Sequence, residues 1–351
     1  MQARQTHIDA LKLIGSQLIV LHHFAAYGPL ADAMSQAAPQ LSAWLYDYAR
    51  MAVQVFLVLG GYLAARNLAP EGQIRIGSPW RTLWRRYQRL VLPFAVALLL
   101  AVAAAMLARH WLADDFIPAA PTLGQTLSHA LLLHGVLGQE SLSAGVWYVA
   151  IDFQLFALMT LLLWLGRRRL WAVLLVLGLM LASLFFFNRH EDWDNWAIYF
   201  FGAYGMGALA YWIGSSRHPG KLLGLLALAG LLSLLLDFRG RIALALVVAL
   251  LLALLQWRDH TSQLQAVMPA PLSRAVGLLG QSSYALFLVH FPVLMLGNAL
   301  FARLQPRGSL AAMGVLLASW AVSLALALLF QRWVEAPLSR LVGYRRKSAA
   351  Q

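Results

Sequence analysis

Apolar residues along this chain gather in long runs that short polar connections separate. A run of about 20 apolar residues is long enough for an α-helix to cross the hydrocarbon core of a membrane. The pattern therefore predicts an all-α polytopic membrane protein with about ten transmembrane helices. The predicted spans lie near 8–27, 43–65, 90–108, 146–166, 170–187, 195–213, 221–236, 242–257, 278–300 and 310–331.

The segment 125–145, "TLSHALLLHGVLGQESLSAGV", is only partly apolar. Its Gly, Ser and Glu residues favour a re-entrant or interfacial piece over an eleventh span. The least distinct spans are 221–236 and 242–257, which only "DFRGR" separates.

Basic residues indicate the orientation of the spans. When ten spans alternate from a cytoplasmic N-terminus, most of the 27 Lys and Arg residues fall in cytoplasmic connections or ends. Cytoplasmic loops of membrane proteins carry such an excess of positive charge. The sequence thus predicts both termini inside, one domain over 1–351, and a short basic cytoplasmic tail over 340–351.

Composition supports a membrane protein over a soluble one. The chain is 61% hydrophobic and only 12% charged, and a soluble domain usually has about 25% charged residues. Its net charge of +13 fits basic loops beside anionic lipid, and no nucleic-acid-binding motif accompanies it. The absence of cysteine excludes disulfides, thiolate metal sites and thiol nucleophiles.

The first apolar run, "KLIGSQLIVLHHF", has two interpretations. Arg4 and Lys12 with a small-residue motif at 31–33 resemble a cleaved signal peptide. Ser16 and Gln17 interrupt the apolar run, however, and its removal would put the charge pattern out of phase with one terminus. A retained first helix is the preferred interpretation.

Three titratable residues on separate predicted spans reach a similar depth. With about 1.5 Å of rise per residue, His23, Asp152 and His290 all lie in the outer half of the membrane. Buried ionisable groups need partners and often mark function in a membrane. A carboxylate can orient an imidazole so that its other nitrogen removes a proton from a hydroxyl. The shared depth therefore allows a general base formed by Asp152 with one of the two histidines, and it leaves open which one.

Each of these residues also has a structural interpretation. A lone intramembrane histidine such as His290 often only bonds two helices together, and His22 points about 100° away from His23, where it can serve packing. A metal site is not predicted, because the histidines lack ligand spacing. A transporter that uses the His/Asp layer as a proton relay is the main alternative function.

A basic segment, "RTLWRRYQRLVLP", precedes the third span. Arg81, Arg85 and Arg89 recur on one helical face, and Arg86 stands beside them. This amphipathic segment is either a positive anchor on the membrane surface or a binding site for donor phosphates, since arginine binds phosphate well.

Six stretches, which follow one another along the chain in the family's order, resemble the integral-membrane acyltransferase-3 family, which O-acylates bacterial glycans. Lys12 and His23 match a basic residue and a catalytic histidine separated by ten residues in the first helix. Arg86-Tyr87-Gln88-Arg89 matches an Arg-x-x-Arg motif. The other stretches are "VFLVLGGYL", "VWYVAIDFQLF", "GQSSYALFLVHFPVL" and "VEAPLSR".

The resemblance implies a ten-helix bundle in a bacterial inner membrane. It implies an O-acyltransferase that moves an acyl group, often acetyl, from cytosolic acyl-CoA to a hydroxyl of a cell-envelope glycan or lipid-linked sugar. Three residues depart from the family pattern: Lys12 replaces Arg, Asp152 replaces Glu, and Gly60 replaces Ser. By this resemblance, the catalytic pair is His23 with Asp152, and the donor-binding residues are Lys12, Arg86 and Arg89. The substrate-lining residues are Trp147, Tyr148, Tyr284 and His290.

Overall fold

The computed structural model describes residues 6–261, 269–305 and 308–348, and every regular element in this part of the chain is helical. Within the described residues, eight helical stretches are long and apolar enough to cross a membrane. Together they confirm an all-α polytopic membrane protein. They are 39–68, 79–108, 147–166, 169–189, 219–236, 240–258, 283–304 and 310–342.

Each of the ten predicted spans falls largely within helix. Two of the predicted spans correspond to helices that are less apolar than the eight stretches above. These helices are α1 (Thr6–Ala26) and α9 (Ala197–Gly214). Asp9, Lys12, Gln17 and three histidines lower the hydropathy of α1, and α9 contains four glycines and three tyrosines. The other helices are bounded as follows: α2 Gly28–Ala37, α3 Pro39–Asp47, α4 Val53–Leu68, α5 Pro79–Ala108, α6 Leu123–Ala130, α7 Trp147–Gly166, α8 Arg169–Phe185, α10 Pro219–Leu236, α11 Gly240–Thr261, α12 Ala270–Gln281, α13 Ser283–Leu304, α14 Ser309–Phe330 and α15 Ala336–Ser348.

Helix boundaries differ from the prediction in three places. The basic segment before the third span is the first part of α5, which runs unbroken through Pro93. The predicted second span is divided, because a 3-10 turn at Ala49–Ala52 joins α3 to α4. The predicted tail from 340 continues as α15 to Ser348, after a π-helical turn at Gln331–Glu335.

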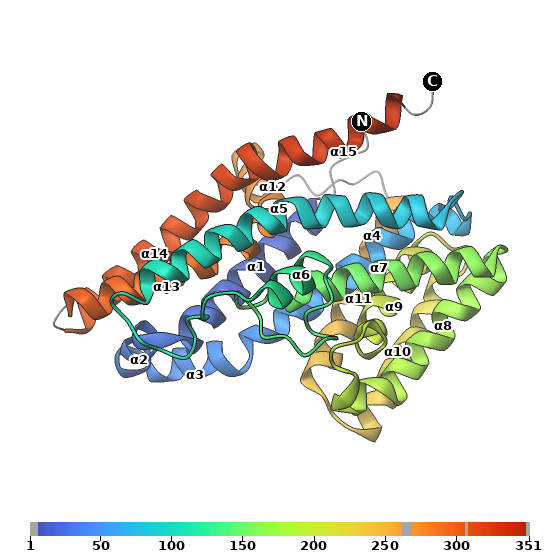
Figure 1. Cartoon of the computed structure of the whole chain (residues 1–351). Helices are drawn as coiled ribbons and strands as arrows, with labels where there is room; N and C mark the ends of the chain where they lie inside the picture. The colour runs from blue at the N-terminus through green and yellow to red at the C-terminus, as the bar shows by residue number, and fades with distance from the viewer. Residues whose placement is uncertain (1–5, 262–268, 306–307, 349–351) are drawn as a thin grey trace. The chain divides into compact units, whose positions relative to one another are not determined.

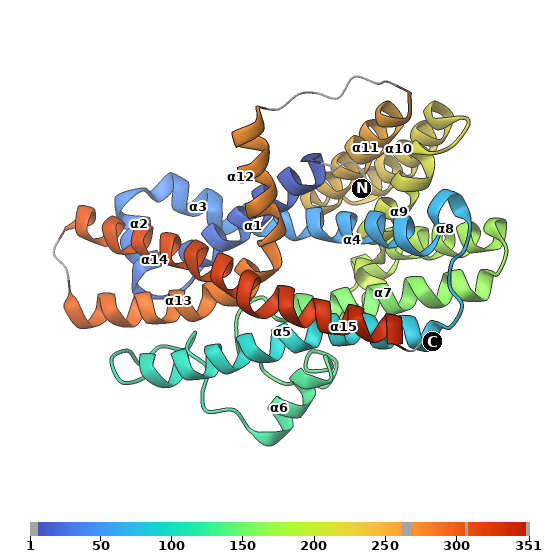
Figure 2. The same ribbon diagram turned by 90° about the horizontal axis from the view of Figure 1, so that it is seen from above.

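The chain forms two compact units. The first comprises residues 1–52, 87–150 and 270–351, and the second comprises 53–86 and 151–269. In the first unit α1 packs against α2, α3, α12 and α13, and α13 lies alongside α14 (Figures 1 and 2). In the second unit α9 packs against α4, α8 and α11.

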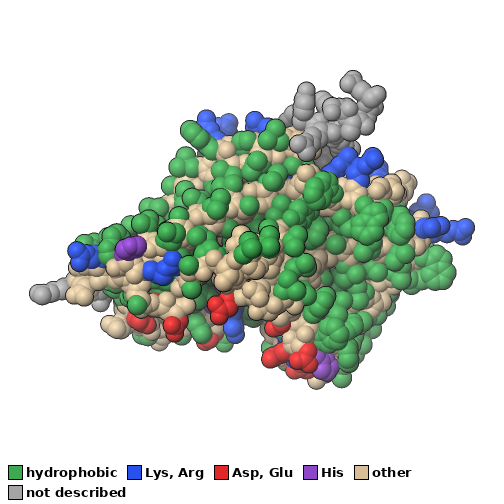
Figure 3. All heavy atoms as spheres, in the orientation of Figure 1, with side chains coloured by type: hydrophobic (Ala, Val, Ile, Leu, Met, Phe, Trp, Pro, Cys, Tyr) green, Lys and Arg blue, Asp and Glu red, His purple; other side chains and the backbone are tan. Residues whose placement is uncertain are grey.

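Close backbone approach holds the second unit together. A Cβ on Gly61 of α4 would overlap the carbonyl of Tyr204, and one on Gly207 of α9 would overlap the carbonyl of Val58. Small residues permit such close crossings between membrane helices. Many large apolar side chains elsewhere remain exposed, including Leu99 and Leu107 of α5, and hydrophobic atoms cover much of the face in Figure 3. This surface suits contact with lipid.

Candidate active site

Two buried histidines meet in the first unit. His23 comes from the last turn of α1 and His290 from the middle of α13, and their side chains are 7% and 0% exposed. His23 Nδ1 lies 2.7 Å from His290 Nε2, and the two rings are nearly parallel, with 5.0 Å between centroids. The sequence placed both residues at one depth, and the structure brings them into direct contact.

The surroundings of His290 determine which nitrogen of each ring carries the proton. His290 Nδ1 lies 2.9 Å from the carbonyl oxygen of Leu286, which can only accept a hydrogen bond. His290 Nδ1 therefore carries a proton, and its Nε2 accepts the hydrogen bond from Nδ1–H of His23. This arrangement leaves the lone pair of His23 Nε2 available to take a proton from a substrate.

Aromatic residues and one glycine surround the histidine pair. The Phe287 ring lies 6.3 Å from that of His290 and 5.7 Å from that of Tyr148. A Cβ on Gly145, whose φ is +80°, would stand 3.2 Å from Phe287 and 3.4 Å from Cε1 of His23. A side chain at Gly145 would thus narrow the space beside the His23 ring.

The other two predicted substrate-lining residues have different surroundings. Trp147 makes an edge-on contact with Tyr148 and is 36% exposed. Tyr284 donates a hydrogen bond of 3.0 Å to the carbonyl of Leu90, which ties α13 to α5. Tyr284 therefore braces two helices, whatever it contributes to substrate binding.

Asp152 lies in the second unit, on α7, and its close partner is Arg86 of α5. Arg86 donates a hydrogen bond of 2.5 Å to Oδ2 of Asp152, and its guanidinium also lies 5.1 Å from the centre of the Phe156 ring. A Cβ on Gly60 would lie 3.8 Å from the Asp152 carboxylate. Because His23 belongs to the other unit, the pairing of His23 with Asp152 stays a prediction.

Two predicted donor-binding residues share a carboxylate in the first unit. Lys12 of α1 and Arg89 of α5 both lie near enough to Glu335 to interact with its charge. Glu335 ends the π-helical turn, and its Oε2 is buried without a hydrogen-bond partner among the described residues. Turns of π-helix often occur at functional sites. The third predicted donor-binding residue, Arg86, lies in the second unit on Asp152.

Sequence reasoning missed a pair of hydrogen bonds from Asn298 of α13 to the chain just after α1, called the Asn298 clamp below. Asn298 of α13 accepts a 2.8 Å hydrogen bond from the N–H of Leu30 and donates one of 3.2 Å to the carbonyl of Tyr27. Gly28 turns the chain between them with φ +76° and has no room for a Cβ. A lone amide in the apolar run of α13, two turns after His290, was the available signal.

His22 has a packing role in the structure. Its Nδ1 lies 3.2 Å from the carbonyl of Leu45, so the ring joins α1 to α3. This agrees with the packing interpretation of His22.

The segment 125–145 contains another buried histidine pair. His129 and His134 stack with ring centroids 4.1 Å apart. His129 is satisfied by Gln125 and by the N–H of Leu142, whereas neither ring nitrogen of His134 has a partner in the part of the chain that the structure describes. Burial and the neighbouring His129 lower the pKa of His134 to about 4. The helix in this segment, α6, has eight residues, which is too short for an eleventh span.

The described residues contain no group of three or more His, Cys, Asp or Glu that could hold a metal ion. The arrangement instead offers a base, His23 Nε2, in an apolar and largely buried setting. Such a group suits proton removal from a hydroxyl during group transfer.

Comparison with known proteins identifies the family. No curated protein and no solved structure matches the chain. The acyltransferase-3 family model, described as an acyltransferase domain, matches residues 6–332, nearly the whole chain. That range includes the histidine pair, the Arg86–Asp152 pair, Lys12 and Arg89. The chain therefore belongs to the acyltransferase-3 family and is a multi-pass membrane acyltransferase.

Proposed function

We propose that this protein is an O-acyltransferase of a bacterial inner membrane. It moves an acyl group, in the simplest case acetyl, from cytosolic acyl-CoA to a hydroxyl of a glycan or lipid-linked sugar at the outer face. The observation that carries this proposal is the hydrogen bond between His23 and His290, which leaves His23 Nε2 unprotonated. The family match favours acyl transfer over the transporter alternative.

His23 acts as the general base in this scheme. Its Nε2 takes the proton of the acceptor hydroxyl as the hydroxyl oxygen attacks the thioester carbonyl. The tetrahedral intermediate collapses, the carbon–sulfur bond breaks, and the CoA thiolate receives the proton from the imidazolium. His290 stabilises the imidazolium, because its Nε2 accepts the hydrogen bond from Nδ1–H of His23 throughout.

The donor is held through its phosphates by Lys12 and Arg89. Both cations interact with the charge of Glu335, so the carboxylate keeps them near one another until phosphate binds. Arg86 belongs to the second unit, and its part in donor binding is a separate hypothesis. Asp152 orients Arg86 directly, and its proposed action on His23 is a separate hypothesis.

Turnover by the purified full-length protein tests the proposal. Acetyl-CoA and a membrane glycan extract are supplied, and both CoA release and glycan acetylation are measured. His23→Ala should lower the rate about 100-fold or more, as loss of a general base does. His290→Phe removes the hydrogen-bond acceptor and should also be slow, whereas His290→Gln retains an acceptor and should recover part of the rate.

His110→Ala is the matched control, because His110 is exposed and its hydrogen bond is to the carbonyl of Met106, in the last turn of the helix that it follows. A folded His23→Ala protein that acylates at the normal rate would refute the role of His23. Equal losses in His290→Phe and His290→Gln would refute the tautomer argument.

A further inference from the structure

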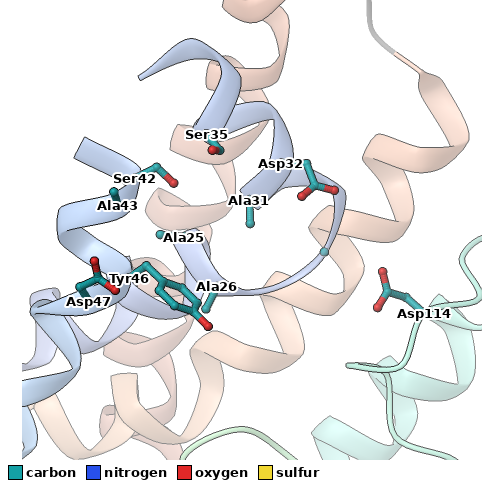
Figure 4. Close-up of a pocket in the computed structure, with 11 residues that line it drawn as sticks. Ala25, Ala26, Ala31, Asp32, Ser35, Ser42, Ala43, Tyr46, Asp47 and Asp114 are labelled. Atoms are coloured by element: carbon teal, nitrogen blue, oxygen red, sulfur yellow. The ribbon is translucent and has the colours of Figure 1, made fainter. Parts of the chain in front are cut away.

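A pocket of about 540 Å³ lies in the first unit, at the C-terminal end of α1. Helices α2 and α3 and the loop after α5 complete its wall (Figure 4). Ala25 and Ala26 line it, and these residues lie about 3–5 Å farther along the helix axis than His23. Its volume falls within the range of small-molecule sites, about 300–1,000 Å³. The pocket thus lies at the same end of α1 as the proposed base, although neither histidine of the pair lines it.

The charged residues of the pocket are all acidic. Asp32, Asp47 and Asp114 line it, and no Lys or Arg does. Figure 4 places Asp47 on one side of the space and Asp32 and Asp114 on the other. Asp32 and Asp47 have no ion-pair partner among the residues that the structure describes. Carboxylates accept hydrogen bonds from hydroxyl and ammonium groups, and they repel anions.

The presence of Ser42 distinguishes this pocket from an ordinary acidic surface. Its side chain is only 5% exposed, and it points into the pocket in Figure 4. Within the described parts of the chain its Oγ has no hydrogen-bond partner. Because this hydroxyl faces the pocket, a polar group of a bound ligand can form the hydrogen bond that the described residues do not supply.

Tyr46 connects the pocket to the histidines. It lines the pocket, its side chain is 51% exposed, and its ring centroid lies 6.0 Å from that of His22, the neighbour of His23. Its ring offers an apolar surface on which the C–H face of a sugar ring can lie, while the carboxylates and Ser42 bind hydroxyls.

We propose that this pocket binds the acyl acceptor and selects a sugar-sized polyol that is uncharged or carries an amino group. Sugars with carboxylate or phosphate groups are rejected by the three aspartates. This inference rests on the proposed function for its final step, in which a hydroxyl of the bound ring reaches His23. Binding and charge selection require only the pocket.

Saturation-transfer NMR on the purified full-length protein tests binding without catalysis. The probes are methyl glucoside, methyl glucosaminide and methyl glucuronide, which share one ring and differ in charge. We expect the amino and neutral sugars to bind, and the glucuronide to bind about tenfold more weakly than the glucoside. Ser42→Ala should weaken the binding of the neutral sugar about two- to tenfold through one lost hydrogen bond.

Charge reversal provides the decisive variant. Asp32→Lys with Asp47→Lys should reverse the preference in favour of the glucuronide, and both positions are exposed, so the fold tolerates the change. The control is Asp115→Lys, which adds the same charge beside Asp114 at a residue outside the pocket lining. It should retain the original order. The proposal would be overturned if the double variant kept the original order of sugar affinities. It would also be overturned if Asp115→Lys reversed that order as the double variant does.

The same three sugars supplied with acetyl-CoA separate this inference from the proposed function. Charge-selective binding without any acetylation would leave the pocket standing and refute the acyl-transfer function. Acetylation that depends on His23 but is indifferent to the charge of the sugar would refute the pocket and leave the acyltransferase standing.

Discussion

The pair formed by Arg86 and Asp152 makes a quantitative prediction about the second unit. Their atoms lie 2.5 Å apart, and the side chains are 29% and 13% exposed. Removal of one partner from a fully buried pair costs about 3–5 kcal/mol, and an exposed pair contributes about 1 kcal/mol or less. For this intermediate burial we expect Asp152→Asn and Arg86→Gln each to reduce the free energy of unfolding by about 2 kcal/mol.

The double variant should be less destabilised than the sum of the two single variants, because the second substitution removes a charge that the first left unpaired. Reversible unfolding in mixed micelles measures the four stabilities. Arg85→Gln is the control: Arg85 neighbours Arg86 on the same helix, but it is exposed and has no ion pair with any residue that the structure describes. Its stability should change by less than about 0.5 kcal/mol.

Activity of the same variants distinguishes two roles of Asp152. If its main role is to hold Arg86, both single variants should raise the KM for acetyl-CoA. Additive stabilities, together with a loss of kcat confined to Asp152→Asn, would refute that reasoning. Such a result would favour the predicted action of Asp152 on His23.

Three further predictions concern other parts of the molecule. Gly61→Ala should destabilise the protein by about 2 kcal/mol or more, because its Cβ would overlap backbone, whereas Gly178→Ala, whose Cβ meets open space, should be neutral or slightly stabilising in the same unfolding assay. Glu335→Gln removes the anion that competes with donor phosphates, so the KM for acetyl-CoA should fall about two- to tenfold in steady-state assays; an increase would contradict this. The pKa of His134 is about 4 in the folded protein, against an ordinary value of 6.5 for a histidine side chain, so its contribution to stability is complete above pH 6.5 and is lost as pH falls toward 4. This loss of stability is at most about 3 kcal/mol. Thermal unfolding at about pH 7.5 and at about pH 5 should reveal it. His134→Phe should reduce the difference in stability between these two pH values.

The helices of this protein were largely predictable from the sequence, because apolar runs must be helical in a membrane. The boundaries were less so. The sequence pattern did not show that the basic segment and the third span form one helix, α5, since charge marks where a helix leaves the membrane and not where it ends. The 3-10 turn at Ala49–Ala52 contains no proline or glycine, so the sequence did not indicate a break in the predicted second span.

The sequence predicted the depth of the candidate site residues in the membrane, but it did not predict which of them contact one another. Counting residues along each span placed His23 and His290 in one layer, and they touch. The same counting could not reveal that His290 would be the contact of His23, because depth says nothing of rotation about a helix or of which helices are neighbours. The Asn298 clamp and the pocket at Ser42 depend wholly on tertiary packing, which single-sequence patterns do not encode.

The Asn298 clamp has a mechanical consequence for α1 and α13. The two helices are joined at His23–His290 and again about two turns later along α13, where Asn298 holds the chain on both sides of Gly28. Two attachment points oppose both sliding and rotation of α13 relative to the end of α1. We therefore expect the two helices to move as one rigid unit. The contact between His23 and His290 should therefore keep its geometry when other segments of the chain move.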